Sequence, residues 1–177
     1  MAEPITLAEA KLHLRVLSND EDLYIEGLIP PARRYIELRS GITINQRQFI
    51  ESQFPAYGVI RLDKGPLVSI DEIAYTDEVG GALTYTGARF FPGSSVILPA
   101  IGESWPTLGV SETFQITYTA GLSPAELATD DYDNLTHAMK LLVGHWYANR
   151  ESVVEGDYRE VPLAVNALCD QVRMPVL

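Results

Sequence analysis

The sequence has very few of the residues on which most catalytic and metal sites depend. Its 177 residues include one cysteine, Cys169, and three histidines, so an internal disulfide and a zinc site built from cysteine pairs are excluded. There is no glycine-rich phosphate loop of the Gly-x4-Gly-Lys-Ser/Thr type and no Gly-x-Ser-x-Gly nucleophile motif. No apolar run reaches the roughly 18 residues that a membrane-spanning helix needs. The first residues, Met-Ala-Glu-Pro, do not resemble a secretory signal.

The residues that remain as chemical candidates have simpler structural interpretations. His137 and His145 are expected on one helix but two turns apart, which is too far for one metal ion. Cys169 lies among apolar residues and is predicted to be a buried, inert thiol. The acidic cluster at 130–133 precedes an expected helix, where the helix dipole and the free N–H groups favour negative charge. We therefore expect no catalytic residue, no metal and no cofactor, and the chain is not predicted to be an enzyme.

The chain is acidic, and the acidity is unevenly distributed. The net charge is −11. Residues 1–50 carry six basic and seven acidic side chains, whereas residues 51–177 carry seven basic and seventeen acidic ones. Such a surface repels phosphate, so tight binding to nucleic acid is not expected. Solubility alone is an equally good explanation of the charge.

Two helices are predicted in the N-terminal part. Thr6-Leu7-Ala8-Glu9 has the pattern of a capping box that starts the first, and Ser18-Asn19-Asp20-Glu21 repeats it before the second. Apolar residues then recur at helical spacing over residues 28–36. Pro30-Pro31 lies inside this second helix and predicts a kink or a break, and Gly41 predicts its end.

The middle of the chain has the pattern of strands. From Ile44 the apolar period changes from that of a helix to that of a strand. Short strand-like runs separated by turn residues follow at 59–62, 68–75, 82–86, 95–98 and 113–119. These runs predict a small, mostly antiparallel sheet.

An amphipathic helix is predicted over residues 132–150, with Leu142 and Trp146 turned inward and Tyr147 on another side. A polar, acidic loop follows, and Pro162 is expected to begin a short last helix. The fold class is therefore α+β: N-terminal helices, a small mostly antiparallel sheet, a C-terminal amphipathic helix and an extended arm. We expect one domain over residues 1–160 and an arm with a short helix over residues 161–177.

Several stretches, taken in order along nearly the whole chain, resemble the head–tail connector (adaptor) proteins of tailed phages. They are Pro4–Arg15 followed by Asp20-Glu21-Asp22, then Leu28–Glu37, Leu62–Ile70, Ile116–Gly121, Leu141–Glu151 and Val161–Val165. No single stretch is specific, but the ordered combination is. The pair Pro30-Pro31 departs from the pattern, since small helix-forming residues are expected there.

The resemblance implies a structural role without catalysis, in the virion neck. Connectors of this kind form a homo-oligomeric ring, typically a dodecamer, under the portal protein. The ring extends the DNA channel, through which DNA passes without tight binding, and offers a docking surface for a neck stopper or tail protein. Another phage neck or tail-completion protein, or a small-ligand-binding α+β domain, is the alternative.

The resemblance also indicates which residues contact partners. The C-terminal part of such proteins tends to contact the portal, and the candidates here are the apolar or proline positions of the arm: Val161, Pro162, Leu163, Val165, Leu168, Met174, Val176 and Leu177. The candidates for contacts between subunits are the one basic cluster and an aromatic residue that lies away from the core: Arg33, Arg34, Arg39 and Tyr147.

Overall fold

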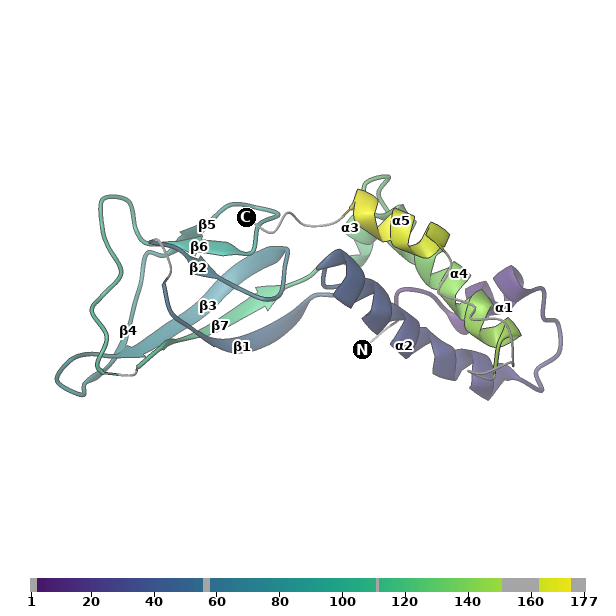
Figure 1. Ribbon diagram of the computed structural model, residues 1–177, viewed down its shortest axis with the longest axis horizontal. Helices are drawn as coiled ribbons and strands as arrows, with labels where there is room; N and C mark the ends of the chain where they lie inside the picture. The colour runs from purple at the N-terminus through teal and green to yellow at the C-terminus, as the bar shows by residue number, and fades with distance from the viewer. Residues whose placement is uncertain (1–2, 56–57, 111, 151–162, 173–177) are drawn as a thin grey trace. The chain divides into compact units, whose positions relative to one another are not determined.

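The computed structural model describes residues 3–55, 58–110, 112–150 and 163–172. The chain forms two compact units (Figure 1). The helical unit is built from both ends of the chain, residues 1–45 and 123–177, and the sheet unit is built from residues 46–122. The predicted α+β class, with N-terminal helices, antiparallel strands and C-terminal helices, is confirmed.

The helical unit contains five helices: α1 (Leu7–Leu14), α2 (Asp22–Ser40), α3 (Pro124–Leu127), α4 (Asp133–Ala148) and α5 (Leu163–Gln171). Its core forms where the apolar stripes of α2 and α4 meet. The fully or almost fully buried side chains of these two helices recur at spacings of one, three or four residues: Ile25, Ile29, Ala32, Ile36, Leu135, Ala138, Met139, Leu142 and Val143. Burial of these stripes provides most of the stability of such helices.

The first predicted capping box is present and the second is absent. Thr6 accepts a hydrogen bond from the backbone N–H of Glu9, and the Glu9 carboxylate accepts from the N–H of Thr6. By contrast, α2 begins at Asp22, and its N-cap residue, Glu21, makes no capping hydrogen bond with its side chain. The Glu21 carboxylate instead accepts hydrogen bonds from Tyr147 and Arg150. The prediction of a second box was therefore wrong because a tertiary contact recruits the carboxylate.

Helix α2 continues through Pro30 and Pro31, so the predicted break does not occur. Both prolines are exposed, and the buried residues on the opposite side, Ile29 and Ala32, hold the helix against the core. Helix α2 ends at Gly41, which has a left-handed φ of 76° as predicted. Helix α3 was not predicted, although Ser123 and Glu126 form a second complete capping box at its start.

The sheet unit contains two antiparallel sheets. Strands β1 (Arg47–Gln53), β3 (Leu67–Thr76), β4 (Ala82–Thr84) and β7 (Phe114–Ala120) form the larger one in the order β1-β7-β3-β4. Strands β2 (Ile60–Arg61), β5 (Arg89–Phe90) and β6 (Val96–Leu98) form the smaller one in the order β2-β6-β5. Central strand β7 alternates strictly between the two faces, and its buried residues are Phe114, Ile116, Tyr118 and Ala120.

The core of the sheet unit is rich in aromatic rings. Phe114 is fully buried and lies 5.6 Å from the ring of Tyr75 and 5.4 Å from that of Trp105. Trp105 donates its indole N–H to the carbonyl oxygen of Gly58 at 3.0 Å. Tyr118, also fully buried, stacks on Phe49. These contacts join β7 to segments on both sides of it.

Replacing Thr6 by alanine is expected to lower the free energy of unfolding by about 1 kcal/mol, because the cap of α1 is lost. Hydrogen bonds from Thr6, the backbone one first, hold the pKa of Glu9 below 4.5. A lowered carboxyl pKa stabilises the fold above pH 4.5, and this contribution disappears as the pH falls through the folded-state pKa. Urea denaturation at neutral and acidic pH should show the difference between the variant and the wild type shrinking in acid. Ser18→Ala is the matched control and should cost less, since Ser18 caps no helix.

Candidate functional site

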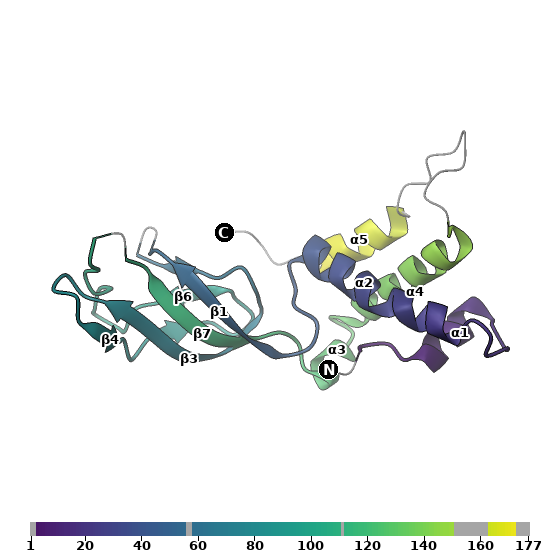
Figure 2. The same cartoon turned by 90° about the horizontal axis from the view of Figure 1, so that it is seen from below.

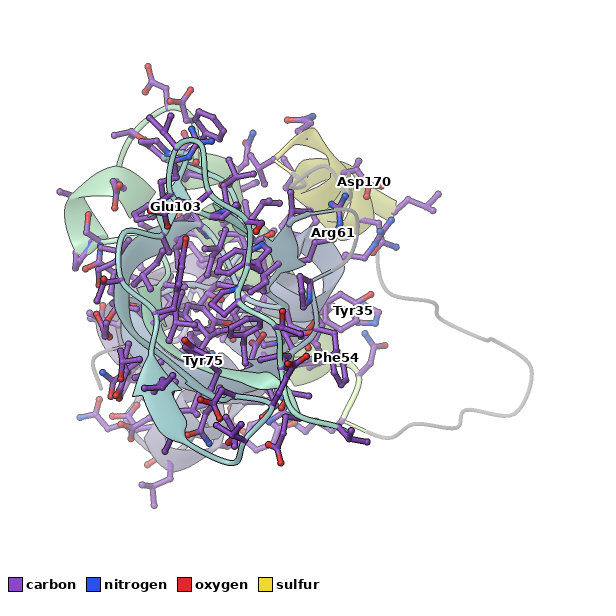
Figure 3. The ribbon with its side chains drawn as sticks, turned by 90° about the vertical axis from the view of Figure 1, so that its left-hand side faces the viewer. Tyr35, Phe54, Arg61, Tyr75, Glu103 and Asp170 are labelled. Atoms are coloured by element: carbon purple, nitrogen blue, oxygen red, sulfur yellow. The ribbon has the colours of Figure 1, made fainter. Side chains whose placement is uncertain are left out.

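The three arginines predicted to mediate subunit contacts all lie on α2, but their surroundings differ. Arg33 forms ion pairs with Glu3 at 2.8 Å and with Glu37 at 3.2 Å. Arg39 forms an ion pair with Asp170 of α5 at 2.8 Å; Asp170 is labelled in Figure 3. Within the described part of the chain, Arg34 is exposed and makes no ion pair or hydrogen bond.

Tyr147 belongs to a cluster that fastens the end of α4 to the start of α2. Its hydroxyl donates a hydrogen bond to the Glu21 carboxylate, which also forms an ion pair with Arg150. The Arg150 guanidinium lies over the rings of Tyr24, at 4.6 Å, and Tyr147, at 5.0 Å. The hydrogen bond to Glu21 raises the pKa of Tyr147 and lowers that of Glu21. The predicted separation of Trp146 from Tyr147 is confirmed, since Trp146 packs edge-on against Tyr35 instead.

Helix α5 is packed into the helical unit. Val165 and Cys169 are fully buried, whereas the side chain of Leu163 is 80% exposed. Asn134 of α4 donates to Gln171 at 2.9 Å, and the hydroxyl of Tyr35, labelled in Figure 3, donates to Asn166 at 3.3 Å. Leu163 is therefore the portal-contact candidate on α5 whose side chain is most available to a partner.

The thiol of Cys169 has the predicted properties. Burial raises its pKa to about 11, and it forms no disulfide. A thiol of this kind is almost entirely protonated at neutral pH and is a poor nucleophile.

The other portal-contact candidates lie mostly outside the described residues. These are Val161, Pro162, Met174, Val176 and Leu177. Leu168 is described and is half-buried. The expected domain boundary at residue 160 also falls outside the described residues. Helix α5 contacts α2 and α4 and therefore belongs to the helical unit.

The acidic cluster at 130–133 lies at the start of α4, as predicted, with Asp133 in the first turn. The N-cap residue, Tyr132, makes no capping hydrogen bond with its side chain, and the acidic side chains favour this helix end through the helix dipole. The described ranges contain no group of three or more His, Cys, Asp or Glu side chains that is able to hold a metal ion. In those same ranges, no helix is long and apolar enough to cross a bilayer.

Charged groups of the sheet unit serve local structure. Asp71 accepts hydrogen bonds from Gln48, Ser69 and Thr119, which keep its pKa low. Tyr118 donates to Glu51, and its burial raises the pKa of the phenol. Except for the Ser69–Asp71 bond, these contacts join residues that are 23 to 67 positions apart, so local sequence patterns contain no signal for them.

The comparison with family models matches residues 4–78 to the family described as phage gp6-like head–tail connector protein. This range covers α1, α2 and the first three strands. The predicted resemblance to head–tail connectors is confirmed over this part of the chain. No curated protein sequence matches the chain.

Solved structures with the same fold come from particles called gene transfer agents (GTA). One is a chain in the "Neck of empty GTA particle computed with C6 symmetry", with 24% identity, a TM-score of 0.77 and coverage of 100% of this chain and 95% of that chain. A second, in the "Virion of native gene transfer agent (GTA) particle", has 23% identity, a TM-score of 0.77 and the same coverage. A third, in the "Neck of native GTA particle computed with C12 symmetry", has 23% identity, a TM-score of 0.74 and coverage of 97% and 90%. The fold of this chain over its whole length is thus found in chains of these particles.

Proposed function

From the match of residues 4–78 to the phage gp6-like head–tail connector family, we propose that this chain is a subunit of the neck of a phage-like particle. In this proposal, copies form a ring, typically of twelve, beneath the portal protein. The ring extends the DNA channel and presents a docking surface to the next neck or tail protein. The family match is the observation that carries the proposal.

Two further observations support a ring in the neck. The solved chains that share the fold over nearly their whole length come from necks described with C6 and C12 symmetry. The chain also has 24 acidic and 13 basic residues, and an acidic surface beside a channel lets DNA slide because it repels phosphate.

The C-terminal arm is the proposed portal contact. Arg150, the last described residue before the gap, is held by Glu21 and two tyrosine rings. This cluster fixes the point from which the chain leaves α4. Leu163, exposed at the start of α5, then supplies an apolar contact, whereas Val165 is buried and packs inside the helical unit.

A ring assembly predicts closed oligomers of the full-length chain. Native mass spectrometry at high concentration, with and without portal protein, is expected to show a discrete species of about twelve subunits. Electron microscopy of particles is expected to place this species between the portal and the tail. A chain that stays monomeric with portal present, and that is absent from the neck, would overturn the proposal.

A further inference from the structure

One side of α2 is left uncovered by the helical unit. In Figures 1 and 2, α4 and α5 lie beside α2, and a side of α2 remains on which no described helix of the unit packs. The exposed residues on this side recur mostly at spacings of three and four. They form the outer face of α2: Leu23, Gly27, Pro30, Pro31, Arg34 and Leu38.

The outer face of α2 has an unusual composition for a solvent-exposed helix surface. Leu23 and Leu38 are 86% and 71% exposed. Between them lie one glycine and two prolines, the residue types least favourable inside a helix. A Cβ atom on Gly27 would have no heavy atom within 4 Å, so packing inside the subunit does not require glycine there. The residues of this face are poorly explained by the stability of the single subunit.

The two prolines and Gly27 also change the hydrogen bonding of the helix backbone on this face. Pro30 and Pro31 have no N–H, so the carbonyl oxygens of Glu26 and Gly27 lose their usual donors four residues later. Gly27 has no side chain to cover these oxygens. A second protein surface is thus able to approach the backbone closely and donate hydrogen bonds to it.

Charge indicates what this second surface is. The neighbouring Arg33 and Arg39 are neutralised inside the subunit, whereas Arg34 has no ionic partner in the described part of the chain. Three acidic residues at the start of α4 are exposed and form no ion pair there: Asp130, Asp131 and Asp133. One subunit thus carries a positive charge on one face and a complementary negative cluster on another.

We propose that the outer face of α2 packs against the start of α4 in a neighbouring copy of this chain, with Arg34 of one copy facing the acidic cluster 130–133 of the next. The inference rests on the proposed ring and adds to that proposal the two surfaces that meet between neighbouring subunits. Because the surfaces differ, the contact is heterologous, which is the type of contact that builds a ring when the rotation between neighbouring copies closes.

The variant Gly27→Gln in the full-length chain tests whether a larger side chain on the outer face of α2 blocks the contact with a neighbouring copy. The thermal midpoint is expected to stay equal or rise, since the side chain enters open space and glycine is removed from a helix. Self-association, measured by sedimentation velocity over a concentration series, is expected to weaken at least tenfold. Ala8→Gln, at an exposed position of α1, is the matched control and should leave self-association unchanged.

The charge pairing is tested by reversal and rescue. Arg34→Asp is expected to weaken self-association at least tenfold without changing the thermal midpoint. Asp130→Arg with Asp131→Arg, placed in that same chain, is expected to restore most of the loss. Asp133 is left intact because it lies in the first turn of α4, where the helix dipole favours it.

The outcomes separate this inference from the ring itself. Normal rings from Gly27→Gln and from Arg34→Asp would overturn the assigned surfaces while leaving the proposed function intact. If these variants formed normal rings that no longer attached to portal, the outer face of α2 would be a portal contact, and the inference would also be overturned. A wild-type chain that forms no oligomer under any condition would overturn both proposals together.

Discussion

Replacing Val165 by aspartate is expected to release α5 from the helical unit. Val165 belongs to α5, and its side chain is fully buried. An unpaired carboxylate at a buried position costs several kcal/mol. Separation of the helix from α2 and α4 would relieve this cost. A loss of about 3 kcal/mol in the free energy that holds α5 against α2 and α4 corresponds to a roughly hundredfold increase in the fraction of molecules in which α5 is detached, the open population.

Cys169 makes this release directly measurable. It is the chain's one cysteine, it lies one turn from Val165 on α5, and it is fully buried. The rate of labelling by a thiol reagent is expected to rise by about two orders of magnitude in the Val165→Asp variant, following the open population. Wild-type protein, with a thiol pKa of about 11, should react slowly at neutral pH.

Leu163→Asp is the matched variant, because it places the same charge on the same helix at an exposed position. It should leave Cys169 protected and the thermal midpoint unchanged, yet reduce attachment to portal. If Leu163→Asp left portal attachment at the wild-type level, the assignment of Leu163 as a portal contact would be wrong. This comparison is cleaner than deletion of the arm, which would also remove the packed residues of α5.

Phe114→Ala is expected to destabilise the sheet unit by about 3–5 kcal/mol. Phe114 is fully buried and contacts both Tyr75 and Trp105, so truncation removes a large apolar surface and leaves a cavity. Because the chain forms two compact units, the loss should fall mainly on one of them. The helical unit should keep its own transition.

The chain's two tryptophans allow the units to be followed separately. Trp105 is partly buried and packs against the core of the sheet unit, and Trp146 lies in α4. In Phe114→Ala, the fluorescence transition of Trp105 is expected to move to lower denaturant concentration while that of Trp146 stays in place. Single-tryptophan backgrounds, Trp146→Phe and Trp105→Phe, isolate the two signals. Leu142→Ala should have the opposite effect, and equal shifts of both transitions in either variant would show that the units unfold together.

Sequence patterns predicted correctly those elements that are determined by a few neighbouring residues. The capping box at Thr6, the end of α2 at Gly41 and the alternation of β7 are each determined within a few neighbouring residues. Strand β5 was missed because its two residues are too few for a period to be visible. Helix α3 was missed although its Ser-x-x-Glu signal was readable.

The interactions that define the candidate surfaces could not be predicted in the same way. Arg39 and Asp170 are 131 positions apart, and Tyr147 and Glu21 are 126 apart. The sequence identified Arg33, Arg34 and Arg39 as one basic cluster. Only the fold shows that two of the three are neutralised within the subunit, and that the remaining charge lies on an uncovered face.

The order of the elements along the chain has a consequence for folding during synthesis. The sheet unit is contiguous, and its first and last residues are neighbours in space, since Arg47 pairs with Ala120. It is able to complete its contacts soon after residue 122 has left the ribosome. Helix α2 has no such opportunity, because α4, which covers its apolar stripe, follows about a hundred residues later, and contacts this distant in sequence form slowly. Until then the stripe of Ile25, Ile29 and Ile36 remains without its cover, so the helical unit is the part of this chain for which a chaperone is most useful.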